Sequence, residues 1–343
     1  MTPRLVLLPR KARPFFGRHP WVFAGAVARA EGEPEDGGEI DLVSHEGEFI
    51  ARGLHNSQSK IVARLYSWEQ GEAIDEAFLA RKIRAAVRLR EALGLMDPAG
   101  ACRLVNSEGD GLSGLTVDRY GKWLAVQFTA LGMGMRRGLA AKILGDLLSP
   151  EGIYLRTEKG IGELEGLEAR DGPLTGGDPP PLEIEEGGLS LAVNLAQGHK
   201  TGYYLDQREN RAAVAALAQG RRVLDGFCYS GGFALQALKA GAAEAVGVDS
   251  SEPALALARA NAERNGLAER SSFVRADVFN DLEERAGNGE RFGVVVLDPP
   301  KMARSRGGIE DALRGYRRLM SLGLRLVEED GFLAMCCCSG RIT

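Results

Sequence analysis

The segment Leu297-Asp298-Pro299-Pro300-Lys301 follows the apolar run Val294-Val295-Val296, and it decides the fold of the C-terminal half. A buried strand that ends in Asp-Pro-Pro delivers a carboxylate and backbone carbonyls to the rim of a parallel sheet, because proline stops the strand and fixes the turn. Ligands of open α/β sheets bind outside this carboxyl edge. The next expected strand, 332–337, brings Cys338-Ser339-Gly340 to the same edge.

Strands and helices alternate strictly after Asp206, which predicts an α/β fold with a doubly wound parallel sheet. The expected strands are 222–225, 245–249, 272–277, 294–298 and 332–337, and the expected helices are 207–218, 232–240, 252–265, 280–286 and 310–327. Asp225, Asp249, Asp277 and Asp298 end four strands in succession. One such acid usually caps the helix that follows it. Four in order predict a cofactor-binding edge.

Two smaller domains are predicted before this sheet. Residues 1–72 contain short strands separated by glycine turns, at 39–43, 49–54 and 61–66, which is typical of a small β-barrel. Residues 73–181 predict an α+β domain with helices at 76–93 and 134–148 and strands at 115–118, 123–128 and 152–156. The Gly- and Pro-rich segment 171–181 is expected to be a surface connection. A hairpin of 182–185 and 189–193 then opens the third domain, 182–343.

The composition is that of an ordinary globular protein, with 44% hydrophobic and 26% charged residues in 343. No apolar run approaches the ~18 residues of a membrane span, and the N-terminus lacks a signal-peptide pattern, so no membrane association is expected. Three of the five cysteines are consecutive, which does not make a disulfide framework. The four histidines are scattered, so no metal site is expected. These features predict a reduced, cytoplasmic protein.

The distribution of charge along the chain indicates RNA binding, although the net charge of −4 argues weakly against it. Residues 1–30 hold six basic side chains and no acid, interleaved with Phe15, Phe16, Trp21 and Phe23. A second basic cluster follows the Asp-Pro-Pro turn and comprises Lys301, Arg304, Arg306, Arg314, Arg317 and Arg318. Such clusters contact phosphates and aromatic rings stack on bases, but either cluster alone is equally well explained as a solvated face. The candidate RNA-binding residues are Arg10, Lys11, Arg13, Arg18 and Trp21.

The loop after the first strand of the parallel sheet argues against NAD. Residues 226–232 do not read Gly-x-Gly-x-x-Gly, and Phe227 and Tyr229 put bulk where a pyrophosphate would need space. A cofactor that keeps ribose and adenine but has no pyrophosphate fits this loop better.

Several motifs together resemble the RlmI-like family of S-adenosylmethionine-dependent large-subunit ribosomal RNA cytosine-5 methyltransferases. They are Asp225-x-Phe227-x-Tyr229-x-Gly231-Gly232-Phe233, Val248-Asp249-Ser250-Ser251, Asn265-Gly266-Leu267, Leu297-Asp298-Pro299-Pro300-Lys301, Lys200-Thr201-Gly202 with Asp206-Gln207-Arg208, Ser107-Glu108-Gly109-Asp110-Gly111 and Val117-Asp118-Arg119-Tyr120-Gly121. The resemblance covers nearly the whole chain. It implies that the N-terminal barrel is a PUA-like RNA-binding domain and that the C-terminal sheet is a Rossmann-like methyltransferase domain.

The resemblance also implies a cofactor site for S-adenosylmethionine. Asp249 is expected to bind the ribose, Asp277 the adenine end, and the 225–231 loop with Lys200, Thr201 and Gln207 the methionine end. The full expected set is Lys200, Thr201, Gln207, Asp225, Phe227, Tyr229, Gly231, Asp249, Ser250, Asp277, Asp298 and Pro299.

Cys338 matches the family's nucleophile position, although Cys337 stands where the family has a serine. A thiolate that adds to carbon 6 of cytosine activates carbon 5 for methylation. Asp298 is then expected to hold the N3/N4 edge of the base, and Lys301 or Arg304 to favour the thiolate. The expected partner is large-subunit ribosomal RNA.

Two alternatives remain open from the sequence: methylation of a different base atom without a cysteine nucleophile, and a non-catalytic RNA-binding factor. The sequence stops three residues after Gly340, whereas family members continue with a helix and a hairpin, so a sheet truncated after its fifth strand is expected. The last strand would be an exposed apolar edge that favours association, a homodimer included.

Overall fold

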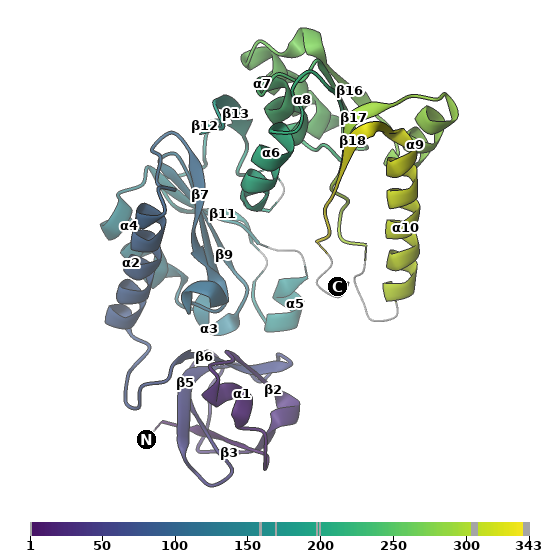
Figure 1. Ribbon diagram of the computed structural model, residues 1–343. Helices are drawn as coiled ribbons and strands as arrows, with labels where there is room; N and C mark the ends of the chain where they lie inside the picture. Colours follow the sequence, from purple (N-terminus) through teal and green to yellow (C-terminus); the bar gives the residue numbers. More distant parts are fainter. Residues whose placement is uncertain are drawn as a thin grey trace. The chain divides into compact units, whose positions relative to one another are not determined.

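The computed structural model describes residues 2–157, 160–168, 170–196, 198, 200–302 and 308–338 (Figure 1). The chain divides into two compact units. Unit 1 comprises Met1–Ile184 and Val193–Leu205, and unit 2 comprises Glu185–Ala192 and Asp206–Thr343. The division of the chain into three domains at 72 and 181 stays a prediction.

The N-terminal part of unit 1 is a six-stranded sheet around its own apolar core. Its strands run in the order β2-β6-β5-β4-β1-β3 and are β1 Arg4–Leu7, β2 Trp21–Phe23, β3 Val27–Glu31, β4 Glu39–Val43, β5 Phe49–His55 and β6 Ile61–Ser67. The strands expected near 39–43, 49–54 and 61–66 are therefore confirmed. The basic N-terminal stretch adds three more strands and the short helix α1, Arg13–Phe16, whose Phe15 is buried in the core.

The rest of unit 1 is a five-stranded sheet in the order β11-β10-β9-β8-β7, with helices packed beside it. The strands are β7 Ala101–Asn106, β8 Leu115–Tyr120, β9 Trp123–Phe128, β10 Gly152–Leu155 and β11 Gly172–Thr175, and the helices are α2 Glu76–Ala92, α3 Leu131–Gly134, α4 Arg137–Leu148 and α5 Ile161–Glu165. The expectation that 171–181 is only a surface connection was wrong, since β11 pairs with β10. Pro173 is tolerated there because β11 lies at the edge of the sheet.

A two-stranded hairpin, β12 Leu182–Glu186 and β13 Leu189–Val193, confirms the hairpin expected from the sequence. Residues of this hairpin from Glu185 to Ala192 belong to unit 2. Within unit 2, Glu186 forms a buried ion pair with Arg211, with Arg211 Nε 2.7 Å from Glu186 Oε1.

Unit 2 contains a five-stranded, fully parallel sheet in the order β16-β15-β14-β17-β18. The strands are β14 Arg222–Gly226, β15 Glu244–Asp249, β16 Ser271–Arg275, β17 Phe292–Leu297 and β18 Val327–Met335, and the helices are α6 Arg208–Ala215, α7 Gly232–Lys239, α8 Glu252–Arg264, α9 Val278–Gly287 and α10 Ile309–Leu326. The chain starts in the centre of the sheet, moves outward through β15 and β16, and returns to the other side of β14 with β17. This reversal creates the switch point at which α/β sheets bind ligands.

Two local expectations for unit 2 were wrong. The last strand begins at Val327, directly after α10, and ends at Met335, so Cys336 and Cys337 follow the strand instead of belonging to it. In its pairing with β17, Val327 lies opposite Phe292, but the next paired residue is Phe332, opposite Val294. The register shifts there because β18 carries extra residues, among them Glu328-Glu329-Asp330. The helix α9 is also longer than 280–286, since Asp277 caps it from the preceding residue.

Helices cover both faces of this sheet (Figure 1). The helices α9 and α10 pack against each other, and α7 packs against both α6 and α8. All six residues of β17 are buried, which explains why its sequence is a continuous apolar run instead of an alternating pattern. None of the described helices combines the length and apolar character that crossing a membrane requires.

We expect Leu319→Ala to lower the free energy of unfolding by about 2–5 kcal/mol, because it leaves a cavity in the core beneath α10. Leu319 is fully buried, whereas Leu324 on the same helix is 60% exposed. Leu324→Ala is the matched control and should change stability by less than about 0.5 kcal/mol. Urea denaturation measures both, and equal losses would contradict the packing described for α10.

Candidate active site at the carboxyl edge of the parallel sheet

The carboxyl ends of neighbouring strands in unit 2 bring three carboxylates and a thiol to one edge. Asp225 is the fourth residue of β14, Asp249 ends β15, and Asp298 follows β17. Cys336 follows β18, and its backbone N–H donates to the Leu297 carbonyl at 2.9 Å. The expectation that these strand ends meet is therefore confirmed for the described residues.

Asp225 is fully buried and only partly satisfied. Its Oδ2 accepts a hydrogen bond of 3.0 Å from the backbone N–H of Ala234 in the first turn of α7. Its Oδ1 is buried without a hydrogen-bond partner. Burial, together with the negative charges of Asp298 and Asp249, raises the pKa of Asp225 to about 8. A buried carboxylate oxygen of this kind fits a cationic donor such as the ammonium group of a methionine moiety.

The loop that follows β14 adopts a strained backbone. Phe227 and Tyr229 have φ angles of 64° and 49°, in the left-handed region that bulky residues rarely adopt. The conformation is held by hydrogen bonds, since Cys228 N donates to Val248 O at 3.1 Å and Gly231 N donates to Cys228 O at 2.8 Å. Strain that is over-determined in this way is concentrated at ligand-binding sites.

Asp249 ties this loop to the sheet. Its Oδ2 accepts from the backbone N–H of Tyr229 at 2.9 Å, and its Oδ1 accepts from Ser251 N at 2.8 Å. Each carboxylate oxygen has a second lone pair with which it can accept from ribose hydroxyls. Ser250, beside it, is exposed.

Asp277 caps a helix, which is the usual role of an acid that stands between a strand and a helix. Its side chain accepts from Asn280 N at 3.1 Å and caps α9. Asp225 also serves the first turn of α7, but its buried second oxygen sets it apart. A role of Asp277 at the adenine end stays a prediction.

The Asp-Pro-Pro turn and the cysteine run are in direct contact. The Cys338 thiol donates to the Pro299 carbonyl with 3.6 Å between sulfur and oxygen. Gln207 Nε2 donates to Asp298 Oδ2 at 3.0 Å. Lys301 is exposed directly after the turn, while Arg304 and Arg306 lie outside the described residues.

The three consecutive cysteines differ in their surroundings. Burial, and the nearby Asp298 charge, raises the pKa of the Cys336 thiol to about 11, so this thiol stays neutral at physiological pH. Cys337 and Cys338 are exposed, and all five cysteines of the chain are free thiols.

A cavity of about 570 Å³ in unit 2 lies between α6 and the end of β18. Its polar lining includes Asp206, Gln207, Asn210 and the cysteines 336–338, and its apolar lining includes Phe233 and Met335. Its volume is of the size expected of a small-molecule site. Asn210 is not among the site residues expected from the sequence. It stands three residues after Gln207, and this spacing puts two side chains on one helix face.

Lys200 and Thr201 belong to unit 1. Thr201 is fully buried, and its hydroxyl donates to Asp118 Oδ2 at 2.5 Å and lies 3.0 Å from the Tyr120 hydroxyl. These bonds attach the Thr201 segment to β8. The side-chain geometry of Thr201 therefore gives no support to the expected contact with the cofactor. Lys200 Nζ lies 4.4 Å from the centroid of the Tyr204 ring.

The basic N-terminal residues Arg10, Lys11, Arg13 and Arg18 are all exposed. Phe16 and Phe23 are exposed as well, whereas Phe15 is core. Trp21 is half-buried, and its indole N–H donates to Glu108 Oε1 at 2.9 Å. In the second basic cluster, Arg314 pairs with Asp311 and Arg318 with Glu283, which weakens the case for that cluster as a phosphate site.

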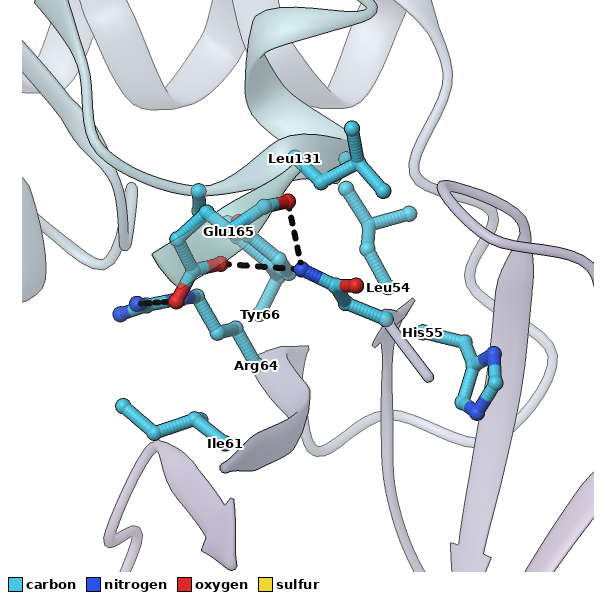
Figure 2. A pocket seen from close by; sticks show the side chains of 10 residues that line it. Leu54, His55, Ile61, Arg64, Tyr66, Leu131 and Glu165 are labelled. Atoms are coloured by element: carbon cyan, nitrogen blue, oxygen red, sulfur yellow. Dashed lines mark hydrogen bonds and ion pairs between the residues drawn. The ribbon is translucent and has the colours of Figure 1, made fainter. Parts of the chain in front are cut away.

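A polar cavity in unit 1 is a structural feature and not a ligand site. Arg64 and Glu165 point toward one another in it, with 2.9 Å between Arg64 Nη2 and Glu165 Oε1 (Figure 2). Its volume of about 10 Å³ leaves room for roughly one water molecule. Among the described residues, no group of three or more His, Cys, Asp or Glu side chains is arranged to hold a metal ion.

Comparisons with known proteins agree with this architecture. A family model of PUA-like domains matches residues 5–68, and a family model of S-adenosylmethionine-dependent methyltransferases matches residues 173–342. Ribosomal RNA large subunit methyltransferase I from Escherichia coli K12 is 41% identical over 345 residues, covering 100% of this chain and 87% of the relative, and the protein of strain O127:H6 matches equally well.

Two solved structures share the fold. SMU.776, described as a methyltransferase and solved in complex with SAH, has a TM-score of 0.83 at 23% identity and covers 98% of this chain and 85% of its own. A candidate SAM-dependent methyltransferase from Streptococcus mutans has a TM-score of 0.82 at 22% identity, covering 100% and 87%. The α/β class, the PUA-like domain and the methyltransferase sheet expected from the sequence are confirmed.

The raised pKa of Asp225 makes stability depend on pH. Between the ordinary pKa of 3.8 and about 8, the unfolded state is ionised at this position while the folded state holds the proton. Stability should therefore fall as pH rises through this window, by up to about 1.4 kcal/mol per pH unit, and level off above it. The Asp225→Asn variant lacks this ionisable group and should not show the loss. Its free energy of unfolding, measured by urea denaturation without cofactor, should therefore rise relative to that of the wild type from pH 5 to pH 8. A difference that does not change with pH would contradict the buried neutral acid.

Proposed function

Because the chain belongs to the family of ribosomal RNA large subunit methyltransferase I, which uses S-adenosylmethionine, we propose that it methylates carbon 5 of a cytosine in large-subunit ribosomal RNA. The observation that carries the proposal is the contact between the Cys338 thiol and the Pro299 carbonyl. The contact supports the proposal because it joins the Cys338 thiol to the residue after Asp298, and because Cys338 lines the unit 2 cavity.

The residues at the sheet edge fit the cofactor. The buried Oδ1 of Asp225 suits its ammonium group, and the Asp249 carboxylate suits its ribose hydroxyls. The strained loop of Phe227, Tyr229 and Gly231 brings backbone groups to the same edge. When bound, S-adenosylmethionine supplies an electrophilic methyl group on a positively charged sulfur.

The chain's own residues have to activate the base, since cytosine carbon 5 is a poor nucleophile. The Cys338 thiolate forms a bond to carbon 6, and the electron pair displaced to carbon 5 takes up the methyl group. Carbon 5 then gives its proton to a base, and the bond between carbon 6 and sulfur breaks to release the thiolate. Asp298 holds the N3/N4 edge during these steps, and Lys301 favours the ionised thiol by its charge.

We expect Cys338→Ala to abolish methyl transfer to in vitro transcribed large-subunit ribosomal RNA while leaving the affinity for S-adenosylmethionine unchanged. The matched control is Cys337→Ala, which removes an exposed neighbouring thiol and should keep its activity. Labelled methyl transfer, nucleoside mass spectrometry and calorimetry with the cofactor measure these effects.

The outcomes separate the alternatives. Activity retained in Cys338→Ala, or a methyl group on another atom, would replace the cysteine mechanism by direct methylation of a different base atom. Absence of cofactor binding by the wild type in calorimetry would favour a non-catalytic RNA-binding factor.

RNA affinity is proposed to come from the exposed basic residues of the PUA-like domain. Arg13→Ala should lower the slope of log affinity against log salt by about 0.7–0.9, the effect of losing one phosphate contact. Arg29→Ala is the control, because Arg29 already pairs with Glu31 at 2.6 Å. Filter binding at several salt concentrations measures the slope, and equal slopes for Arg13→Ala and the wild type would count against this surface.

A further inference from the structure

Two side-chain amides at the start of α6 form a hydrogen-bonded chain that ends on Asp298. Asn210 Nδ2 donates to Gln207 Oε1 at 2.6 Å, and Gln207 Nε2 donates to Asp298 Oδ2 at 3.0 Å. Both amides line the same cavity as the cysteine run. The chain therefore connects the helix to the Asp-Pro-Pro turn, where the nucleophile also lies.

Asn210 and Asp298 together select the direction of these bonds. A primary amide donates from its nitrogen and accepts at its oxygen, so turning it by 180° exchanges the two ends. The donor of Asn210 fixes the oxygen of Gln207 on its own side and leaves the nitrogen to face Asp298. In the opposite orientation, Gln207 would set its oxygen against a carboxylate oxygen, which repels it.

The Gln207 amide also acts on the Cys336 thiol, whose pKa it lowers against the rise that burial causes. Gln207 and Cys336 line the same cavity.

We propose that Asn210 is a positioning residue for methyl transfer, which acts by holding the Gln207 amide so that it donates to Asp298 and fixes that carboxylate in one orientation. The inference rests on the proposed function, because it assigns Asn210 to the same reaction. It adds a residue whose side chain is linked to Asp298 through Gln207.

The isosteric variant Asn210→Asp tests this role, because a carboxylate only accepts and draws the Gln207 nitrogen away from Asp298. We expect kcat to fall about tenfold, the effect of one misplaced hydrogen bond to a charged group, while KM and the cofactor affinity stay within about twofold. Ala212→Glu adds the same charge at an exposed position of α6 and should leave kcat unchanged. Thermal unfolding of each variant confirms that it is folded.

A double-mutant cycle makes the test specific. Asn210→Ala should lower kcat about tenfold in the wild type and have no further effect in the Gln207→Ala background, because Asn210 acts only through Gln207. Additive losses, or an unchanged kcat in Asn210→Asp, would overturn the positioning role and leave the proposed function intact. Absence of methyl transfer by the wild type would overturn both.

Discussion

The pairing of β17 between β14 and β18 is the constraint on which the candidate site depends. Gly226 lies opposite Leu297, and Leu297 lies opposite Met335. The residues that directly follow these three therefore form one row at the carboxyl edge of the sheet. These residues are Phe227, Asp298 and Cys336. Because a slip of one residue turns every side chain to the other face, this register decides that the acid and the thiol meet. The cysteine that touches Pro299 is two residues beyond the row.

The same register concentrates negative charge. Asp225, Asp249 and Asp298 stand on three adjacent strands, and the charges of the latter two help to raise the pKa of the buried Asp225. Such an arrangement costs stability when no cation is present. A fold keeps an unfavourable group of this kind where a ligand compensates for it, which is consistent with the proposed cofactor site.

Many other polar side chains of the chain are structural. Thr201 and Asp118 are buried together in unit 1, and Glu165 accepts hydrogen bonds from Arg64, Asn56 and Ser59 beneath the N-terminal sheet. The carboxylates of Asp118 and Glu165 are satisfied by these hydrogen bonds, whereas Arg64 Nε is buried without a partner. Thr201 is a motif residue whose hydroxyl is bonded within unit 1, and its expected role at the cofactor stays a prediction.

The sequence by itself determined the α/β class and the succession of five parallel strands along the chain, because buried parallel strands are continuous apolar runs. It also determined that Asp249 ends one strand and that Asp298 follows another, where proline stops the strand. It did not determine β11, whose only signal is backbone pairing with β10. Nor did it separate Asp277, which caps a helix, from Asp225, which keeps a buried oxygen without a partner. The hydrogen bonds of Asn210 and Thr201 likewise appear only in the tertiary structure. A hydrogen bond between residues distant in sequence depends on how strands and helices pack, and no local pattern records it.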